Sequence, residues 1–209
     1  MKTFNVLKDF VVIEGLDGSG TTTQLDLLEK KSKKHGIKVY STMEPTDGAI
    51  GKIIRDALRK NLVMEPETLA LLFSADRNEH LYGNDGIIQY INNGYKVISD
   101  RYFFSSIAYQ SLNCSRDWVI SINTFPLPEF LFFIDVPPDI CQSRMKSRKC
   151  VELFDDLLLQ KKILENYKHG INIYSGTGMK IHYIDGTDSA DTINEKIWNI
   201  INPMPINIL

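Results

Sequence analysis

The sequence predicts an α/β fold, in which a mostly parallel five-stranded sheet is covered by helices on both faces. Short apolar segments alternate with helix-like segments along the chain, which is typical of parallel strands joined by helical crossovers. Most of these apolar segments end at an acidic residue or a glycine. Right-handed crossovers bring the carboxyl ends of parallel strands to one edge of the sheet, so we expect these polar residues to converge there.

The predicted strands are short runs of apolar and β-branched residues that stop at polar residues. They cover residues 10–13, 38–42, 95–99, 129–135 and 180–184. The order of the strands in the sheet does not follow from their order in the chain.

The predicted helices show apolar residues at helical spacing, with Gly36 after the first helix and Pro66 opening the third. They cover residues 24–35, 49–59, 66–81, a segment from about residue 105, 118–122, 139–149, 153–174 and 190–201. Together the elements predict one domain over residues 1–209.

Composition excludes several classes of protein. Hydrophobic residues make up 43% and charged residues 24% of the chain, and the net charge is −2, so no polyanion or membrane surface is expected as a partner. The cysteines, Cys114, Cys141 and Cys150, are odd in number and scattered, which predicts free thiols and a cytoplasmic protein. The N-terminus does not resemble a signal peptide, and the most apolar stretch, residues 125–136, is too short to span a membrane.

A glycine-rich stretch is the main functional signal. Residues 10–23 read FVVIEGLDGSGTTT, an apolar strand followed by three glycines and a helix start. This layout is typical of a phosphate-binding loop, in which backbone N–H groups and a helix N-terminus surround an anion. Thr21 stands where such loops usually carry lysine. The alternative is a glycine turn that joins a buried strand to a helix and binds nothing.

Asp100 and Arg101 follow the third predicted strand directly. Asp100 is a candidate Mg²⁺ ligand, directly or through water, and Arg101 is a candidate for bidentate phosphate binding. The alternative is a structural ion pair between the two neighbours.

Phe73 and Arg77 lie four residues apart on one predicted helix and therefore point the same way. A ring beside a guanidinium suits stacking on a nucleobase and hydrogen bonding to it. The alternative places Phe73 in the core and Arg77 on the surface.

A basic cluster follows the fourth predicted strand, and it consists of Arg144, Lys146, Arg148 and Lys149. It is interpreted either as a solvated helix face or as a lid, over about residues 141–153, that brings cations onto a transferring phosphoryl group. The four histidines show no metal-ligand spacing and are expected to be incidental.

Together these stretches resemble thymidylate kinase, a family of the P-loop nucleoside monophosphate kinase superfamily that phosphorylates dTMP with ATP. The most specific match is SDRYFFSSIAYQ, residues 99–110. LLFSADRNEH (71–80), EPTDGAIGKIIR (44–55), IDVPPDICQSRMKSR (134–148) and IDGTDS (184–189) match further family segments in order.

The resemblance implies a P-loop NTPase fold, ATP with Mg²⁺ as the phosphoryl donor, dTMP as the acceptor and a homodimer. Implied ATP-binding residues are Gly15, Leu16, Asp17, Gly18, Ser19, Gly20, Thr21, Thr22, Asp185, Gly186 and Thr187. Implied dTMP-binding residues are Asp17, Glu44, Arg55, Phe73, Arg77, Arg101, Tyr102, Ser106, Tyr109 and Gln110. Implied metal ligands are Thr22 and Asp100, and implied catalytic residues are Asp100, Arg101, Arg144 and Arg148. Within these sets, Asp17 would contact the acceptor sugar, Phe73 would stack on thymine, and Tyr102 would crowd a ribose 2′-hydroxyl.

Three departures from the family pattern concern catalysis more than fold. Thr21 replaces the lysine, Met43 stands where an arginine usually precedes Glu-Pro, and Cys150 and Val151 replace an aspartate–arginine pair in the lid.

The expected activity is dTMP phosphorylation. One alternative is a kinase of the same fold for another nucleotide or for a deoxynucleoside, for which Glu14 would be the candidate base. The other is a nucleotide-binding protein that has lost catalysis.

Overall fold

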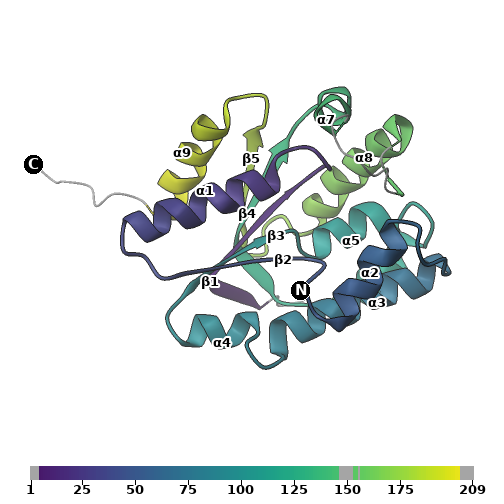
Figure 1. Ribbon diagram of the computed structural model, residues 1–209, viewed down its shortest axis with the longest axis horizontal. Helices are drawn as coiled ribbons and strands as arrows, with labels where there is room; N and C mark the ends of the chain where they lie inside the picture. The colour runs from purple at the N-terminus through teal and green to yellow at the C-terminus, as the bar shows by residue number, and fades with distance from the viewer. Residues whose placement is uncertain (1–4, 146–152, 155, 203–209) are drawn as a thin grey trace, which may run out of the picture.

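Five parallel strands form one sheet in the order β2-β3-β1-β4-β5 (Figure 1). The structure, a computed structural model, describes residues 5–145, 153, 154 and 156–202. The strands are β1 (Val6–Gly15), β2 (Val39–Met43), β3 (Lys96–Asp100), β4 (Leu127–Asp135) and β5 (Lys180–Asp185). The predicted parallel α/β fold is therefore confirmed.

Helices lie on both faces of this sheet, with α1 and α9 on one face and α4, α5 and α8 on the other (Figure 1). The helices are α1 (Thr21–Lys34), α2 (Ala49–Leu58), α3 (Pro66–Tyr82), α4 (Ile87–Asn92), α5 (Phe103–Gln110), α6 (Arg116–Ser121), α7 (Pro138–Met145), α8 (Leu157–Ile173) and α9 (Ala190–Ile201). In the part of the chain that the structure describes, no helix is long and apolar enough to cross a membrane.

The central strand β1 sets the position of the polar edge. Its apolar residues 10–13 are fully buried between the two helical layers, as expected for a strand covered on both faces. The parallel register pairs Ile13 with Asp100 and Gly15 with Ile134. The carboxyl ends of β1, β3 and β4 therefore lie together, and the segments that follow them meet at one edge.

The main differences from the sequence prediction concern the start of β1, helix α4, and helix α8, which begins at Leu157 rather than at residue 153. Strand β1 begins at Val6, four residues before the predicted start. Its pairing with β4 shifts in register between Leu7 and Val11, around Asp9, where φ is 61°, and the strand extends to both sides of this shift. The short helix α4 was not predicted, since its six residues are too few to show a helical period. The predicted lid of about residues 141–153 lies mostly outside the described residues. Within that range the structure describes only residues 141–145, at the end of α7, and residue 153.

Candidate functional site

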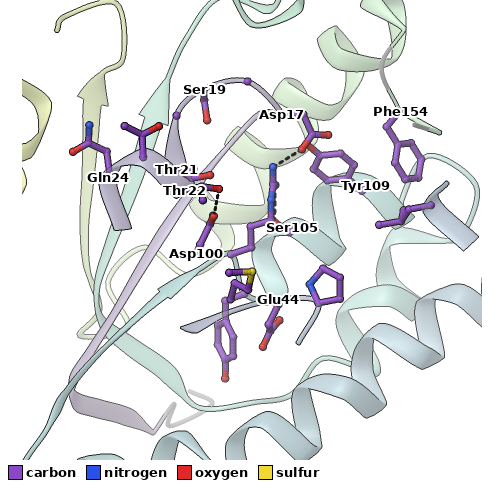
Figure 2. Close-up of a pocket in the computed structure, with 18 of the residues that line it drawn as sticks. Asp17, Ser19, Thr21, Thr22, Gln24, Glu44, Asp100, Ser105, Tyr109 and Phe154 are labelled. Carbon is purple, nitrogen blue, oxygen red and sulfur yellow. Dashed lines mark hydrogen bonds and ion pairs between the residues drawn. The ribbon is translucent and has the colours of Figure 1, made fainter. Parts of the chain in front are cut away.

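A cavity of about 890 Å³ opens at the polar edge of the sheet (Figure 2). One end is formed by the glycine-rich loop and the start of α1, and we call it the loop end. The other end is formed by Glu44, Phe73, Arg77 and Ser106, and we call it the Arg77 end. Asp100 and Arg101 lie on the wall that joins the two ends, so the predicted clusters share one cavity.

The loop end has the backbone of an anion site. Gly18 and Gly20 have φ of 85° and 101°, values that only glycine adopts without strain. A Cβ on Gly18 would lie 2.6 Å from the carbonyl oxygen of Cys141, so the loop also needs glycine for close packing. Helix α1 begins at Thr21 with no side-chain cap on its N-terminus. Its first N–H groups are therefore left for a ligand, which favours the phosphate-binding interpretation.

Thr21 lies in the wall of this loop end and is only 5% exposed. A nearby cation comes from α7 instead. Arg144 Nη2 donates to the carbonyl oxygen of Gly186 at 3.0 Å, and Nη1 reaches that of Ser19 at 3.4 Å. Arg144 thus spans the gap between the glycine-rich loop and the loop after β5, and its side chain lines the cavity. Arg148 and Lys149 lie outside the described residues.

Thr22 and Asp100 meet beneath the glycine-rich loop. Thr22 Oγ1 donates to Asp100 Oδ2 at 2.6 Å, a contact drawn in Figure 2. Asp100 Oδ1 is buried and has no hydrogen-bond partner among the residues described. A hydroxyl beside a carboxylate with a spare oxygen is a donor set that suits Mg²⁺. The alternative of an ion pair between Asp100 and Arg101 is wrong, because Arg101 pairs elsewhere.

Arg101 is held by several acceptors at once. Its Nη2 donates to Asp17 Oδ1 at 2.5 Å, the contact of Asp17 that Figure 2 marks. Its Nη1 reaches the Gly15 carbonyl oxygen at 3.1 Å, Ser105 Oγ at 3.2 Å and Tyr167 Oη at 3.0 Å. Burial alone would lower its pKa, but Tyr109 and Asp17 raise the pKa well above the usual arginine value. Arg101 is therefore a fixed cation on the cavity wall.

Arg77 is buried, with only 1% of its surface exposed, so the alternative that placed it on the surface is wrong. Its Nε donates to Glu44 Oε2 at 2.8 Å and its Nη2 to Ser106 Oγ at 3.1 Å. Its Nη1 donates to Asn123 Oδ1. Three acceptors on different segments thus fix the guanidinium plane at the end of the cavity.

The loop after β2 is held against α3 by acidic side chains. Glu44 Oε1 contacts His80 Nδ1 at 3.1 Å, and His80 Nε2 contacts Thr42 Oγ1 at 2.6 Å. Asp76 accepts from the backbone N–H and the hydroxyl of Thr46 at 2.7 and 2.6 Å. His80, which the sequence led us to expect as incidental, therefore helps to position Glu44.

The other predicted acceptor residues line the same cavity. Phe73 is partly buried and packs on a small apolar cluster of Ile54, Ala57 and Leu69. Tyr102 is fully buried and its hydroxyl donates to the Pro126 carbonyl oxygen at 3.0 Å. The cavity wall also includes Arg55, Ser106, Tyr109 and Gln110. Arg55 is tied to its own loop, through the Pro45 carbonyl oxygen at 2.8 Å and Asp47 at 2.7 Å.

Four predicted ATP-binding residues do not line the cavity: Gly15, Leu16, Asp185 and Thr187. Leu16 is buried, and Gly15 contributes its carbonyl oxygen to Arg101. Asp185 Oδ1 accepts from the N–H and hydroxyl of Thr187 at 2.9 and 2.7 Å, which shapes the turn that carries Gly186 to the cavity.

Several residues that build the site were not predicted from the sequence. Asn123 holds Arg77, and Tyr167 from α8 holds Arg101. Phe154 lines the cavity and its ring meets Tyr109 edge-on at 5.2 Å. Each of these residues lies dozens of residues from its partner, in a segment without a motif. The sequence indicated only that Leu164, Tyr167 and Ile171 share one face of a helix.

Comparison with known proteins agrees with this geometry. The family model for thymidylate kinase matches residues 13–197. A putative thymidylate kinase of Treponema pallidum (strain Nichols) is 39% identical over 199 residues, which cover 92% of this chain and 94% of the relative. A probable thymidylate kinase of Pyrococcus abyssi (strain GE5 / Orsay) is 42% identical over 200 residues, covering 92% of this chain and 95% of the relative. These matches confirm the predicted class, an ATP-dependent nucleoside monophosphate kinase, and the chain belongs to the thymidylate kinase family.

Proposed function

We propose that this chain transfers the γ-phosphoryl group of ATP to dTMP and releases ADP and dTDP. The observation that carries the proposal is one continuous cavity with a glycine-rich anion loop at one end and the buried, fixed Arg77 at the other. A phosphate oxygen of dTMP attacks the γ-phosphorus, and the bond from that phosphorus to the β,γ-bridging oxygen breaks. The dTMP phosphate is already a nucleophile, so the reaction depends on positioning and charge rather than on a strong base.

The acceptor would bind between the Arg77 end and Arg101. Phe73 would stack on thymine, and Arg77 would donate a hydrogen bond to a carbonyl of the base. Arg101 would hold the acceptor phosphate. Ser106, Tyr109 and Gln110 would line the base and sugar, Tyr102 would exclude a 2′-hydroxyl, and Asp17 would contact the sugar. Glu44 and Arg55 would act through their contacts, since Glu44 holds Arg77 and Arg55 holds the loop at Pro45.

The donor would bind at the loop end. Backbone N–H groups of Gly18, Gly20 and Thr22 would surround its phosphates, and the turn at Gly186 would face its base. Thr22 and Asp100 would hold Mg²⁺, which when bound neutralises charge on the phosphate oxygens. Arg144 would supply the cation that Thr21 lacks. The homodimer expected from the resemblance stays a prediction.

A specific contact pattern argues against the deoxynucleoside kinase alternative. A nucleoside 5′-hydroxyl needs a base, and Glu14 was the candidate. Glu14 is fully buried, does not line the cavity, and accepts hydrogen bonds from Ser105, Tyr167 and the backbone. A carboxylate so enclosed does not reach a hydroxyl in the cavity.

A panel of acceptors tests the proposal. Purified enzyme with ATP–Mg²⁺ is incubated with dTMP, dUMP, dCMP, dAMP, dGMP and thymidine, and ADP release is coupled to NADH oxidation. Turnover is expected to be highest with dTMP and undetectable with thymidine. Faster turnover of thymidine than of dTMP would contradict the proposal, and no turnover with tight binding of ATP and dTMP would favour the binding-only alternative.

Phe73→Ala is expected to weaken the binding of dTMP by about 1–3 kcal/mol, because an aromatic ring that stacks on a base contributes that amount to the binding free energy. The KM for dTMP should rise accordingly, while the Kd for ATP stays unchanged. Leu72→Ala is the matched control, because Leu72 packs on the same apolar cluster but does not line the cavity. It should lower the melting temperature only. An unchanged KM for dTMP in folded Phe73→Ala protein would assign Phe73 to packing.

A further inference from the structure

We propose that Glu14 is a positioning residue for the acceptor phosphate, because it fixes the guanidinium of Arg101 through the hydroxyls of Ser105 and Tyr167. The inference rests on the proposed function, in which Arg101 holds that phosphate. Glu14 lies at the end of β1, one residue before the glycine-rich loop, and its side chain turns away from the cavity into the layer of α5 and α8.

The two hydroxyls form parallel bridges between the carboxylate and the guanidinium. Glu14 Oε2 accepts from Ser105 Oγ at 2.7 Å and from Tyr167 Oη at 2.9 Å. Arg101 Nη1 donates to the same two oxygens, at 3.2 and 3.0 Å. Glu14 Oε1 accepts from the N–H groups of Tyr102 and Ser105 at 2.9 and 3.2 Å, so the carboxylate itself is held in place.

The direction of these hydrogen bonds depends on the charge of Glu14. Arginine has only donors, so both hydroxyl oxygens must accept from Arg101 and send their own protons elsewhere. Ser105 Oγ and Tyr167 Oη also lie 2.7 Å from each other, so the two hydroxyls and Glu14 Oε2 form a triangle of hydrogen bonds. An ionised Glu14 accepts protons from these hydroxyls and places a negative charge beside the guanidinium of Arg101. A neutral Glu14 that carries its proton on Oε2 donates to one hydroxyl, and that hydroxyl then donates to the other hydroxyl. The hydrogen bonds remain, but the negative charge that attracts the guanidinium is lost, so Arg101 is held less firmly in one orientation.

Charged and titratable groups face this network from each surrounding element. Tyr167 comes from α8, Tyr109 from α5, and Arg101 with Asp100 from the end of β3. Asp17 of the glycine-rich loop pairs with the far side of Arg101. Burial raises the pKa of Glu14 to about 7, and Arg101, Ser105, Tyr167 and the Tyr102 N–H oppose that rise. Glu14 is therefore protonated below about pH 7 and ionised above it, which sets the sign of the expected pH effect.

Glu14→Gln tests the inference, since glutamine keeps the shape of the side chain and lacks the charge. The kcat/KM for dTMP is expected to fall by about tenfold or more at pH 8, the effect of losing a charged hydrogen-bond partner. The Kd for ATP should stay within about threefold. Glu129→Gln is the control, because Glu129 is a hydrogen-bonded carboxylate on β4 that lies outside the cavity. It is expected to leave kcat/KM unchanged.

The decisive readout is the ratio of kcat/KM for wild type to that for Glu14→Gln, measured between pH 6 and 8.5. The phosphate of dTMP itself titrates near pH 6, and the ratio cancels that contribution. The ratio is expected to rise with pH and to level off about one pH unit above the pKa of Glu14, near pH 8. A constant ratio, or a variant that loses only thermal stability, would overturn the inference. Wild-type turnover of dTMP in the same assay shows that the proposed function itself still holds.

Tyr167→Phe provides a second, independent test if Glu14→Gln does not fold. It removes one bridging hydroxyl, leaves the carboxylate in place, and changes a residue that does not line the cavity. The Kd for dTMP, measured by titration calorimetry, should rise several-fold while the Kd for ATP stays constant. Unchanged dTMP binding in the folded Tyr167→Phe protein would overturn the role of the bridges.

Discussion

Arg144→Ala is expected to lower kcat by about 10³-fold or more, the scale on which a single cation stabilises transferring phosphoryl groups. Charge builds on the phosphoryl oxygens in the transition state, and Thr21 has no charge to offset it. Arg144 lies beside the glycine-rich loop, with its guanidinium on the carbonyl oxygens of Gly186 and Ser19. It would leave these weak acceptors for phosphate oxygens when both substrates are bound. The Kd for ATP should change far less than kcat, because the contact forms in the transition state.

The control for Arg144 is Lys168→Ala, which removes an exposed cation of α8 that pairs with Asp135 and does not line the cavity. It should leave kcat unchanged. Arg148→Ala, alone and combined with Arg144→Ala, tests the other proposed cation of the lid. A kcat within a factor of about three of wild type in all of these variants would show that neither arginine supplies the charge.

Thr21→Lys is expected to recover part of the kcat lost in Arg144→Ala. Thr21 lies at the start of α1 and lines the cavity, so a longer side chain can extend into the phosphate site. The comparison is the double variant against Arg144→Ala alone, with melting temperatures measured on both. If the double variant folds and gains no activity, the missing lysine is not what Arg144 replaces.

Arg101→Ala is expected to weaken dTMP binding by about 2–5 kcal/mol, the cost of removing one partner from a desolvated charge pair. Arg101 would contact the acceptor phosphate from the wall between the two ends of the cavity. The Kd for ATP should change by less than about tenfold, although Arg101 also holds Asp17 and the Gly15 carbonyl oxygen of the loop. Titration calorimetry with each nucleotide separates the two effects.

Arg116→Ala is the matched control, because Arg116 is also a partly buried, hydrogen-bonded arginine but lies outside the cavity. It should leave both affinities unchanged. Equal losses of ATP and dTMP affinity in Arg101→Ala would show that Arg101 supports the glycine-rich loop as a whole rather than the acceptor phosphate.

The sequence was most informative where function is local in the chain. The loop of Gly18 and Gly20 was predicted because glycine is required there by backbone conformation, and the structure gives both a positive φ. Asp100 was predicted as a metal ligand because it directly follows an apolar strand, and the resemblance to the family added Thr22. The structure joins their side chains at 2.6 Å.

Contacts between distant segments were not predictable in the same way. The burial of Arg77 depends on Asn123, which is 46 residues away on the loop after α6. No spacing rule connects the two, so the sequence left the surface interpretation open. Glu14 was read as a candidate base because it lies beside the loop, but the alternation of side chains along β1 turns it toward α8. Which face a residue occupies at the end of a buried strand depends on packing that an apolar run does not reveal.

Direct quantification of dTDP tests the central claim most sharply. Purified protein is mixed with ATP–Mg²⁺ and dTMP, and all nucleotides are resolved by anion-exchange chromatography over time. We expect one dTDP for each ADP, no dTDP without ATP, and a rate that falls in parallel with kcat in Arg144→Ala. Formation of ADP without dTDP, or no conversion despite binding of both nucleotides, would contradict the assignment of this chain as an active dTMP kinase.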